Sequence, residues 1–262
     1  VLRDRFAREA EVLGRLQHPG IAQIFEAGEH DGTPYIAMEY LDASSLAHCS
    51  DASAWSVSEK LAIIARVLDA AHHAHQKGIV HRDLKPENIL VLRVDDQSAW
   101  TPKIVDFGIA AALESEVVAT ITGESDGGFM GTIAYMSPEQ IERPADVDVR
   151  ADIYAISVIA YELLSGVLPI ELAGTSLPNA TRRIVESEPT RLSRALPGVN
   201  PDAEVILAKA LSKEPSRRYE SAAEFAADIR RCLRGEPITA RQASGLYIAS
   251  RFVSRHRVGV SA

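Results

Sequence analysis

The sequence predicts a mixed α+β fold in which a small strand-bearing part precedes a larger helical part. Three observations predict it. Two short apolar segments, residues 21–28 and 33–41, flank a turn signal at Asp31-Gly32. From about residue 58 onward, apolar residues recur at helical spacing. The 262 residues, 46% hydrophobic and 24% charged, are typical of a globular chain with enough core for one large domain or two small lobes.

The elements are expected in the following order. A charged amphipathic helix covers residues 3–17 and ends at His18-Pro19-Gly20, and the two strands of a hairpin follow. The helix "SEKLAIIARVLDAAHHAHQ" opens with a cap at Ser58. The segment "ADIYAISVIAYELLSG" is apolar nearly all round, which predicts a helix buried on every side. A last amphipathic helix starts at Ser221.

Charge, cysteine and histidine content argue against nucleic-acid binding and against a metal site. Residues 230–262 carry seven arginines and one glutamate, which leaves 21 basic and 35 acidic residues in residues 1–229. An acidic body of this kind argues against nucleic acid as a partner. Cys49 and Cys232 lie far apart and have no metal-binding spacing, which favours a reducing compartment. His72 and His75 share a helix face, but a structural role is favoured over a metal site.

The strongest local pattern is "HRDLKPEN" at residues 81–88, a charged turn between the apolar segments "KGIV" and "ILVL". "DFG" follows at residues 106–108 and "SPE" at residues 137–139. Three motifs in this order make the chain resemble the eukaryotic-type protein kinases, and "GTIAYMSPEQ" is most similar to their bacterial serine/threonine branch. The resemblance covers residues 1 to about 235 and implies a two-lobed, protein-kinase-like fold.

The resemblance implies phosphoryl transfer from ATP with Mg²⁺ as cofactor. Asp83 would orient the substrate hydroxyl, Lys85 would reach the γ-phosphate, and Asn88 and Asp106 would supply oxygen ligands to Mg²⁺. A lysine two residues after the catalytic aspartate is typical of serine/threonine kinases, so protein substrates with Ser or Thr acceptors are expected. Taken singly, each of these residues also fits a solvated loop charge; their order as a set favours the catalytic interpretation.

Supporting positions follow from the same resemblance. The nucleotide site would include Glu9 of helix C, the gatekeeper Met38, the hinge residues Glu39 to Leu41, and Leu90 beneath the adenine. The hydrophobic spine would comprise Leu13, Ile24, His81 and Phe107. Asp152 would anchor the catalytic loop, Glu139 would pair with Arg218, and Thr132 would contact the catalytic loop. Arg82 would pair with a phosphorylated activation loop, with Thr120 and Thr122 as acceptors.

The family's glycine-rich loop and strand lysine are missing from the sequence, in which the first lysine is Lys60. The expectation is therefore an N-lobe that is truncated, with residues 1–40 as its remnant, residues 41–235 as the helical lobe and residues 236–262 as a basic juxtamembrane-like tail. Such a chain would be inactive by itself, and its open face would favour homodimerisation. The alternative is a pseudokinase or docking module that binds partner proteins through the helical lobe.

The tail places Arg251, Arg255 and Arg257 just before the apolar residues "VGVSA". Arginines that flank a membrane span hold that end in the cytoplasm. The tail therefore favours a cytoplasmic catalytic domain that is anchored to the inner membrane by a helix beyond residue 262; a solvated basic linker is the alternative.

Overall fold

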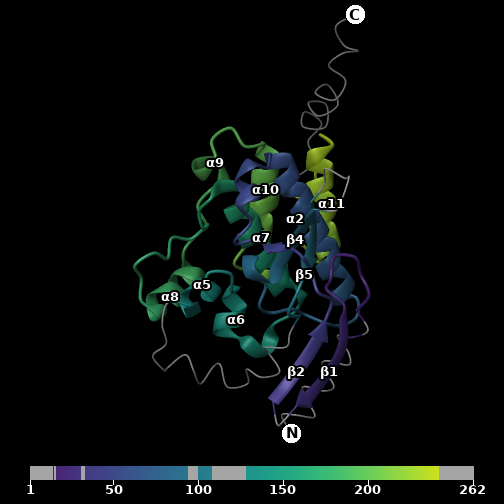
Figure 1. Cartoon of the computed structure of the whole chain (residues 1–262). Coiled ribbons are helices and arrows are strands. Elements are labelled where there is room, and N and C mark those ends of the chain that lie inside the picture. The colour runs from purple at the N-terminus through teal and green to yellow at the C-terminus, as the bar shows by residue number, and fades with distance from the viewer. Residues whose placement is uncertain (1–13, 15, 31–32, 94–99, 108–127, 242–262) are drawn as a thin grey trace, which may run out of the picture.

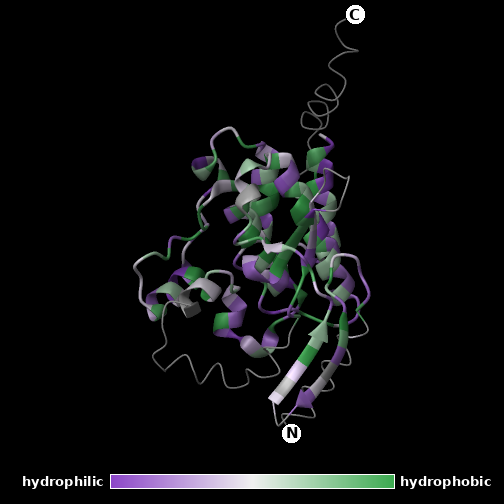
Figure 2. Cartoon of the chain, viewed as in Figure 1, coloured by the Kyte–Doolittle hydropathy of each residue, from purple (hydrophilic) through white to green (hydrophobic). Residues whose placement is uncertain are grey.

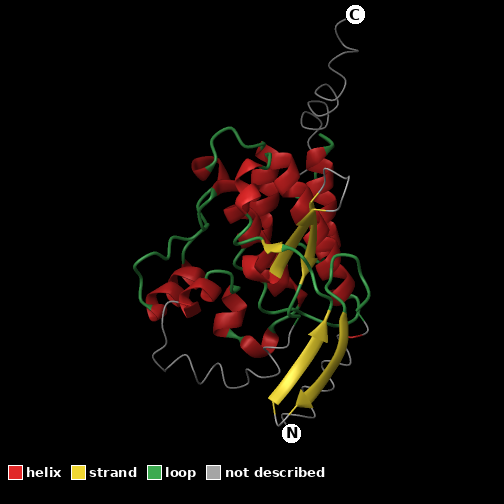
Figure 3. Cartoon of the chain, in the orientation of Figure 1, coloured by secondary structure: helices red, strands yellow, loops and turns green. Residues whose placement is uncertain are grey.

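The computed structural model describes residues 14, 16–30, 33–93, 100–107 and 128–241. Most of the expected helix over 3–17 lies outside these residues, as does the turn at Asp31-Gly32. The same holds for several residues singled out in the sequence: Glu9, Leu13, Thr120, Thr122, Arg251, Arg255 and Arg257. The described part is a mixed α+β structure with a small hairpin beside a larger helical body (Figures 1 and 3).

The hairpin consists of β1 (Ile24–His30) and β2 (Thr33–Met38), which pair antiparallel as expected. Gly28 lies opposite Tyr35, and a Cβ at this position would lie 2.7 Å from the Tyr35 hydroxyl, so the glycine allows the ring to cover the strand. The register shifts between Ile24 and Glu26, which bends β1. The hairpin projects from the helical body toward one end of the molecule (Figure 1).

A second sheet joins the hairpin to the helices. It contains β3 (Ser44–Ser45), β4 (Ile89–Arg93) and β5 (Trp100–Ile104), in that order and all antiparallel. The segment before β1 crosses to β5, where the Ala22 amide donates to the Ile104 carbonyl at 2.9 Å and the Ile104 amide donates to the Gly20 carbonyl at 2.8 Å. The two sheets are thereby fixed to each other at Ile104, which pairs with Ile89 directly after the turn at residues 81–88.

Two long helices form the core. α2 (Val57–His75) and α7 (Val149–Ser165) pack together, and α7 is buried without interruption from Ala151 to Tyr161, as its apolar sequence predicts. Figure 2 shows apolar residues concentrated where these helices meet. The cap of α2 is Ser56 and not Ser58. Ser56 and Glu59 form a capping box, which needs the glutamate three residues after the cap.

Shorter elements complete the body. α10 (Pro201–Ala210) and α11 (Ala222–Leu233) pack on the core helices, and α11 begins after the expected cap, Ser221. A separate group beside them contains α5 (Gly128–Ile133), α6 (Pro138–Glu142) and α8 (Leu177–Glu186) (Figure 1). The remaining bounds are η1 (Ser50–Ala54), η2 (Pro86–Asn88), η4 (Pro144–Asp146), α9 (Leu192–Ala195) and η5 (Pro215–Arg217).

The chain remains packed beyond residue 235, the expected end of the helical lobe. Asp228 of α11 is fully buried and accepts hydrogen bonds from the amides of Thr239 and Ala240, both at 2.8 Å. Ile238 is buried against the same core. The start of the expected tail is therefore packed on the helical body, and the Asp228 carboxylate holds Thr239 and Ala240 against α11.

Candidate active site

The turn at residues 81–88 brings three of the expected site residues into direct contact. The Lys85 ammonium lies 3.2 Å from the Asp83 carboxylate, and the Asn88 side-chain amide donates to the Asp83 carbonyl at 2.9 Å. Both charged side chains are about a quarter exposed. The side-chain nitrogen of Asn88 is engaged in this hydrogen bond, so the side-chain oxygen remains for another partner. The turn thus presents a carboxylate, an ammonium and an amide oxygen together.

Asp152 of α7 holds this turn in place. Its buried carboxylate accepts hydrogen bonds from the amides of His81 and Arg82, both at 2.9 Å, and from the His75 ring at 2.7 Å. Burial opposes ionisation of Asp152, but the hydrogen bond from His75 and the proximity of His81 outweigh burial and lower the pKa of this carboxyl below its usual value. The expected anchoring role is confirmed as a contact, and His75 has a structural partner.

Two residues that are not glycine adopt the left-handed backbone region here. Arg82 has φ of 68° and Asp106 has φ of 58°. They are the only non-glycine residues with positive φ in the described ranges. Such positions cost about 1–3 kcal/mol each and concentrate at functional sites, where the surrounding structure maintains them. The strain falls on the "DFG" segment and on the turn at residues 81–88, which holds the expected catalytic residues and is named the catalytic turn for that reason.

The "DFG" segment packs against the catalytic turn. The rings of His81 and Phe107 lie 4.7 Å apart between centroids, and His81 Nε2 lies 3.0 Å from the Val105 carbonyl oxygen. The Val105 amide donates to the Asn88 carbonyl at 3.0 Å. These contacts fix Asp106, which is exposed, next to Asn88 in the fold. Two of the four expected spine residues therefore stack as the resemblance implies.

The expected hinge follows β2. Met38 lines a small cavity with Asp106 and Phe107, so the gatekeeper position faces the "DFG" segment. The Glu39 carboxylate binds Lys103 of β5, with both oxygens 2.6 Å from Nζ, and this hydrogen bond lowers the pKa of Glu39. The pairing of Glu39 with Lys103 was not predicted. Leu41 and Leu90 are both partly buried, the latter on β4 opposite Lys103.

The "SPE" segment is attached to the late helices and to the catalytic turn. Arg218 is buried and donates two hydrogen bonds, of 2.6 and 2.8 Å, to the Glu139 carboxylate, which confirms the expected pair. The Lys85 ammonium donates to the Thr132 hydroxyl at 3.3 Å, as expected for a contact with the catalytic loop. Gln140 was not singled out in the sequence, yet its side chain donates to the Arg82 carbonyl at 2.6 Å. The pattern Ser-x-x-Gln from residue 137 was the available signal, because it marks a capping box.

A pocket of about 590 Å³ lies beside the catalytic turn, with Pro86 and Glu87 in its lining. Its lining also includes Tyr135 and Glu162, whose side chains are joined by a 2.6 Å hydrogen bond from the Tyr135 hydroxyl. Burial raises the pKa of Tyr135 above its usual value, and the carboxylate of Glu162 adds to this. The tyrosine therefore stays neutral and acts as the donor.

The comparisons with known proteins agree with this geometry. The family model described as "Protein kinase domain" matches residues 2–228. The chain belongs to this family. A probable serine/threonine-protein kinase of Streptomyces coelicolor is 36% identical over 95% of the chain and 36% of its own length. The serine/threonine-protein kinase PrkC of Bacillus subtilis is 37% identical over 86% of the chain and 33% of its own length. The kinase domain thus belongs to the bacterial serine/threonine branch, and the chain spans about a third of these relatives.

Solved structures agree on the fold. The Mycobacterium tuberculosis PknI kinase domain is 30% identical, with a TM-score of 0.65 over 88% of this chain and 79% of that chain. A structure of Rad53 residues 1–466 in complex with AMP-PNP is 27% identical, with a TM-score of 0.67 over 85% of this chain and 53% of that chain. The kinase domain therefore has the protein-kinase-like fold.

Proposed function

We propose that the protein transfers the γ-phosphoryl group of ATP to serine or threonine hydroxyls of other proteins. The observation that carries this proposal is the direct contact of Asp83, Lys85 and Asn88 in a turn that is anchored by the buried Asp152. The Rad53 structure with an ATP analogue supports ATP as the donor, and the named relatives support serine and threonine as acceptors.

Phosphoryl transfer needs alignment and charge neutralisation more than covalent help. In the proposed arrangement, the Asp83 carboxylate accepts the hydrogen bond of the acceptor hydroxyl and receives its proton. The Lys85 ammonium, which already lies between Asp83 and Thr132, faces the transferred phosphoryl group. The hydroxyl oxygen forms the new bond to phosphorus as the bond to the ADP oxygen breaks, so the leaving group departs with its electron pair.

Asn88 and Asp106 fit the needs of Mg²⁺. This ion prefers hard oxygen ligands and keeps phosphate oxygens and waters as its remaining ligands, so two protein side chains suffice. The Asn88 nitrogen is engaged by the Asp83 carbonyl, which leaves the amide oxygen as its ligand atom. Asp106 is exposed and is fixed beside Asn88 by the bond from the Val105 amide. When bound, the ion would neutralise the phosphate charge.

We assign the nucleotide to the side of the hinge, with Met38, Glu39, Leu41 and Leu90 around the adenine and Glu9 near the phosphates. The ion pair with Lys103 supports this assignment for Glu39, because it holds the side chain against β5. The Glu39 amide already donates to the Gln23 carbonyl at 2.8 Å, so we assign the Glu39 carbonyl as the main-chain group that contacts the ligand. The pocket lined by Pro86 and Glu87 continues from the catalytic turn. We place the protein substrate there, because an acceptor hydroxyl at Asp83 must approach from a neighbouring open surface.

The activity is proposed for the whole protein and not for these 262 residues alone. Kinases of this family cover the phosphates with a glycine-rich loop and a strand lysine, and residues 1–262 contain no G-x-G-x-x-G pattern and no lysine before Lys60. Residues 1–262 in isolation, as a domain with a truncated N-lobe, are therefore expected to bind Mg-ATP weakly and to show no transfer. Exposed sheet edges of such a fragment would favour homodimers.

The proposal extends to the position of the kinase in the cell. We propose that the basic residues after 241 lead into a membrane span encoded beyond Ala262, with the kinase domain on the cytoplasmic side. Among the described residues, no helix has the length and apolar character needed to cross a bilayer. The coding sequence decides this point, because about 20 consecutive apolar residues soon after Arg257 are expected and a hydrophilic continuation would contradict it.

The decisive experiment uses the full-length protein with labelled ATP and a serine- and threonine-containing protein substrate. Transfer is expected, with phosphoserine or phosphothreonine in the hydrolysate, and Asp83→Asn should reduce kcat by at least about 100-fold. Asp146→Asn, an exposed carboxylate on η4, is the matched control and should leave kcat unchanged. A full-length protein that binds partner proteins but transfers no phosphate would favour the docking-module alternative. An active Asp83→Asn variant would overturn the catalytic assignment.

A further inference from the structure

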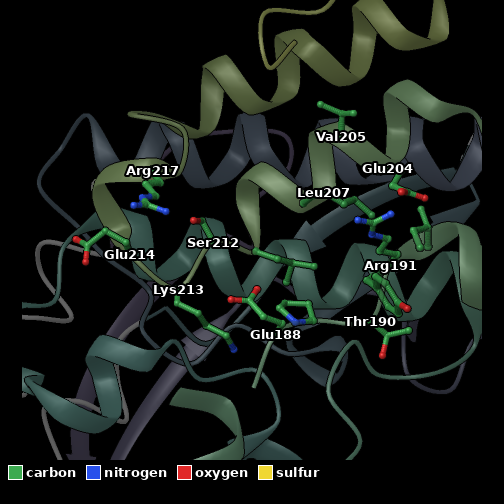
Figure 4. A pocket seen from close by; sticks show the side chains of 15 residues that line it. Glu188, Thr190, Arg191, Glu204, Val205, Leu207, Ser212, Lys213, Glu214 and Arg217 are labelled. Atoms are coloured by element: carbon green, nitrogen blue, oxygen red, sulfur yellow. The ribbon is translucent and has the colours of Figure 1, made fainter. Parts of the chain in front are cut away.

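A cavity of about 820 Å³ opens in the helical body, and none of its lining residues belongs to the catalytic turn (Figure 4). It lies between α10 and the two segments 188–192 and 211–217, and α7 contributes Tyr161. Cavities of about 300–1,000 Å³ are the usual size for small-molecule sites. The proposed kinase activity does not use this cavity.

The inner wall of the cavity is apolar and contains one polar group without a partner. Leu192, Leu207 and Leu211 line it and are almost fully buried. Tyr161 also lines it and is 1% exposed, and its hydroxyl has no hydrogen-bond partner in the part of the chain that the structure describes. A buried hydroxyl without a partner is costly, so a ligand that approaches this wall gains from supplying one.

Lys213 provides a partly buried positive charge at the cavity. Its ammonium donates to the Ile184 carbonyl at 2.5 Å and lies 5.8 Å from the centre of the Tyr154 ring. Among the described residues, no carboxylate lies within ion-pair distance of it. Burial lowers the pKa of Lys213 to about 8, which the charge of Glu188 partly opposes and that of Arg218 reinforces. The ammonium is therefore a partly buried cation without a close counter-ion among the described residues.

The charged residues that line the cavity balance in number, with three carboxylates and three cations, so their surroundings decide which charge a ligand would meet. The Glu204 carboxylate accepts a hydrogen bond from the Ser193 amide at 2.7 Å. The Glu214 carboxylate accepts a hydrogen bond from the Ser216 hydroxyl at 3.3 Å. Glu188 is exposed, and in Figure 4 its carboxylate lies on the same side of the cavity as the Lys213 ammonium. Arg191 and Arg217 line the cavity as exposed cations. Two of the carboxylates already accept hydrogen bonds and the third is exposed to solvent, whereas the Lys213 ammonium is partly buried, so an anion gains more here than a cation or a neutral molecule.

We propose that this cavity binds a small organic anion, an apolar molecule with one carboxylate or phosphate group, whose charge lies against Lys213 and whose body covers Leu192, Leu207 and Leu211. The binding site is independent of the catalytic chemistry. The site is nevertheless connected to the "SPE" segment through Arg218, the partner of Glu139. Arg218 donates hydrogen bonds to the carbonyls of Ser212 and Lys213 at 2.7 and 3.0 Å. A ligand at Lys213 would contact the loop that positions Arg218.

The charge requirement is tested with three probes of one shape, measured by calorimetry on the purified protein: 1-naphthylacetate, 1-naphthyl phosphate and 1-naphthylmethylamine. At least one of the two anions should bind at least tenfold more tightly than the amine. The ratio of the two anions then distinguishes a carboxylate from a phosphate as the natural group. Equal binding of the amine, or no binding of either anion at millimolar concentration, overturns the proposal.

The location is tested with variants. Lys213→Met should weaken the preferred anion at least tenfold, whereas Glu188→Gln should tighten it by removing the competing carboxylate. Ala208→Trp offers an independent test, since this exposed residue lines the cavity and a large ring would fill it without disturbing the core. Arg182→Gln, which removes an exposed charge of α8 that does not line the cavity, is the control and should bind normally. Unchanged affinity in both Lys213→Met and Ala208→Trp would place the probe elsewhere.

The pH dependence gives a third readout. Anion binding favours the charged form of Lys213, whose pKa in the empty cavity is about 8. Affinity for 1-naphthylacetate, which keeps one negative charge over this range, should therefore be nearly constant between about pH 6 and pH 7 and fall about tenfold per pH unit well above pH 8. Lys213→Arg keeps its charge throughout this range and should abolish the fall. A fall of the same size in Lys213→Arg would show that another group titrates.

Discussion

The side-chain amide of Gln140 donates a 2.6 Å hydrogen bond to the carbonyl oxygen of Arg82, a residue 58 positions earlier in the chain. The same side chain also accepts a hydrogen bond from the Ser137 amide at 3.0 Å, which completes the capping box of α6. One side chain thus connects the start of α6 to the strained residue directly before Asp83. Gln140 is therefore a positioning residue for the catalytic turn.

The Gln140→Glu variant separates these two roles. Glutamate preserves the capping box but places a carboxylate oxygen against the Arg82 carbonyl, so the bond to the turn is lost. In the full-length kinase, kcat should fall while the free energy of unfolding changes by less than about 1 kcal/mol. Gln140→Ala should lower both, because it also removes the cap. Measurement of kcat, of KM for ATP and of urea unfolding tests this, and a fully active Gln140→Glu variant would show that the bond does not position the turn.

Removal of the Arg218 side chain should lower the free energy of unfolding far more than substitution of Gln140. Arg218→Met leaves the Glu139 carboxylate buried without its partner, which is expected to cost about 3–5 kcal/mol. Urea denaturation of the purified protein measures this loss. Arg234→Met removes an arginine from an exposed ion pair with Glu236 and should leave the unfolding midpoint unchanged. Equal midpoints for the two variants would contradict a structural role for the buried pair.

Asp228 makes the stability of α11 sensitive to acid. Burial opposes its ionisation, but bonds from the amides of Thr239 and Ala240 and from the Arg231 side chain outweigh burial and lower its pKa below the reference value of 3.8. The stabilisation is therefore complete above about pH 4 and is lost as the pH falls through the folded-state pKa. Asp228→Asn should cost about 3 kcal/mol at pH 7 and flatten the acid limb of the stability curve. Urea titrations between pH 2 and pH 7 test both effects, and an unchanged acid limb in the variant would contradict them.

A second pH effect is expected closer to neutrality. The rings of His18 and His73 lie 5.1 Å apart, and His18 Nδ1 accepts a hydrogen bond from the Gly20 amide at 3.0 Å. Burial lowers the pKa of both rings; for His18 the charge of His73 adds to this and Asp69 opposes it, and for His73 the charges of Lys77 and His72 add to it. Because the unfolded chain binds these protons more readily, stability should fall as the pH drops below about 6.5.

The His18→Asn variant tests this effect, because asparagine keeps an acceptor for the Gly20 amide and does not titrate. The loss of stability between pH 7 and pH 5 should be smaller in His18→Asn than in the wild type, as measured by thermal or urea unfolding. Asp42→Asn, an exposed residue far from the histidine pair in the sequence, is the control. A wild-type slope retained in His18→Asn would assign the effect to other groups.

Motifs and apolar patterns predicted the parts of the site that depend on residue type and order. The burial of α7, the anchoring by Asp152 and the pair of Glu139 with Arg218 were all anticipated. Contacts between distant side chains that belong to none of these motifs were not anticipated. The pairing of Lys103 with Glu39 depends on the register of β5 against the hinge, which no local pattern specifies. The cap of α2 was misplaced by two residues because Ser56 and Ser58 both suit the position, and only Ser56 has glutamate three residues later.

The left-handed backbone of Arg82 has a consequence for selection experiments. A glycine at this position would relieve the backbone strain, so Arg82→Gly lowers the cost of folding while it deletes a side chain from the catalytic turn. A library screened only for heat resistance would therefore enrich an impaired enzyme at this position. Thermostabilisation of this kinase domain needs an activity screen in parallel. The strained backbone of Arg82 lowers the stability of the native fold, but the residue supplies a side chain to the catalytic turn.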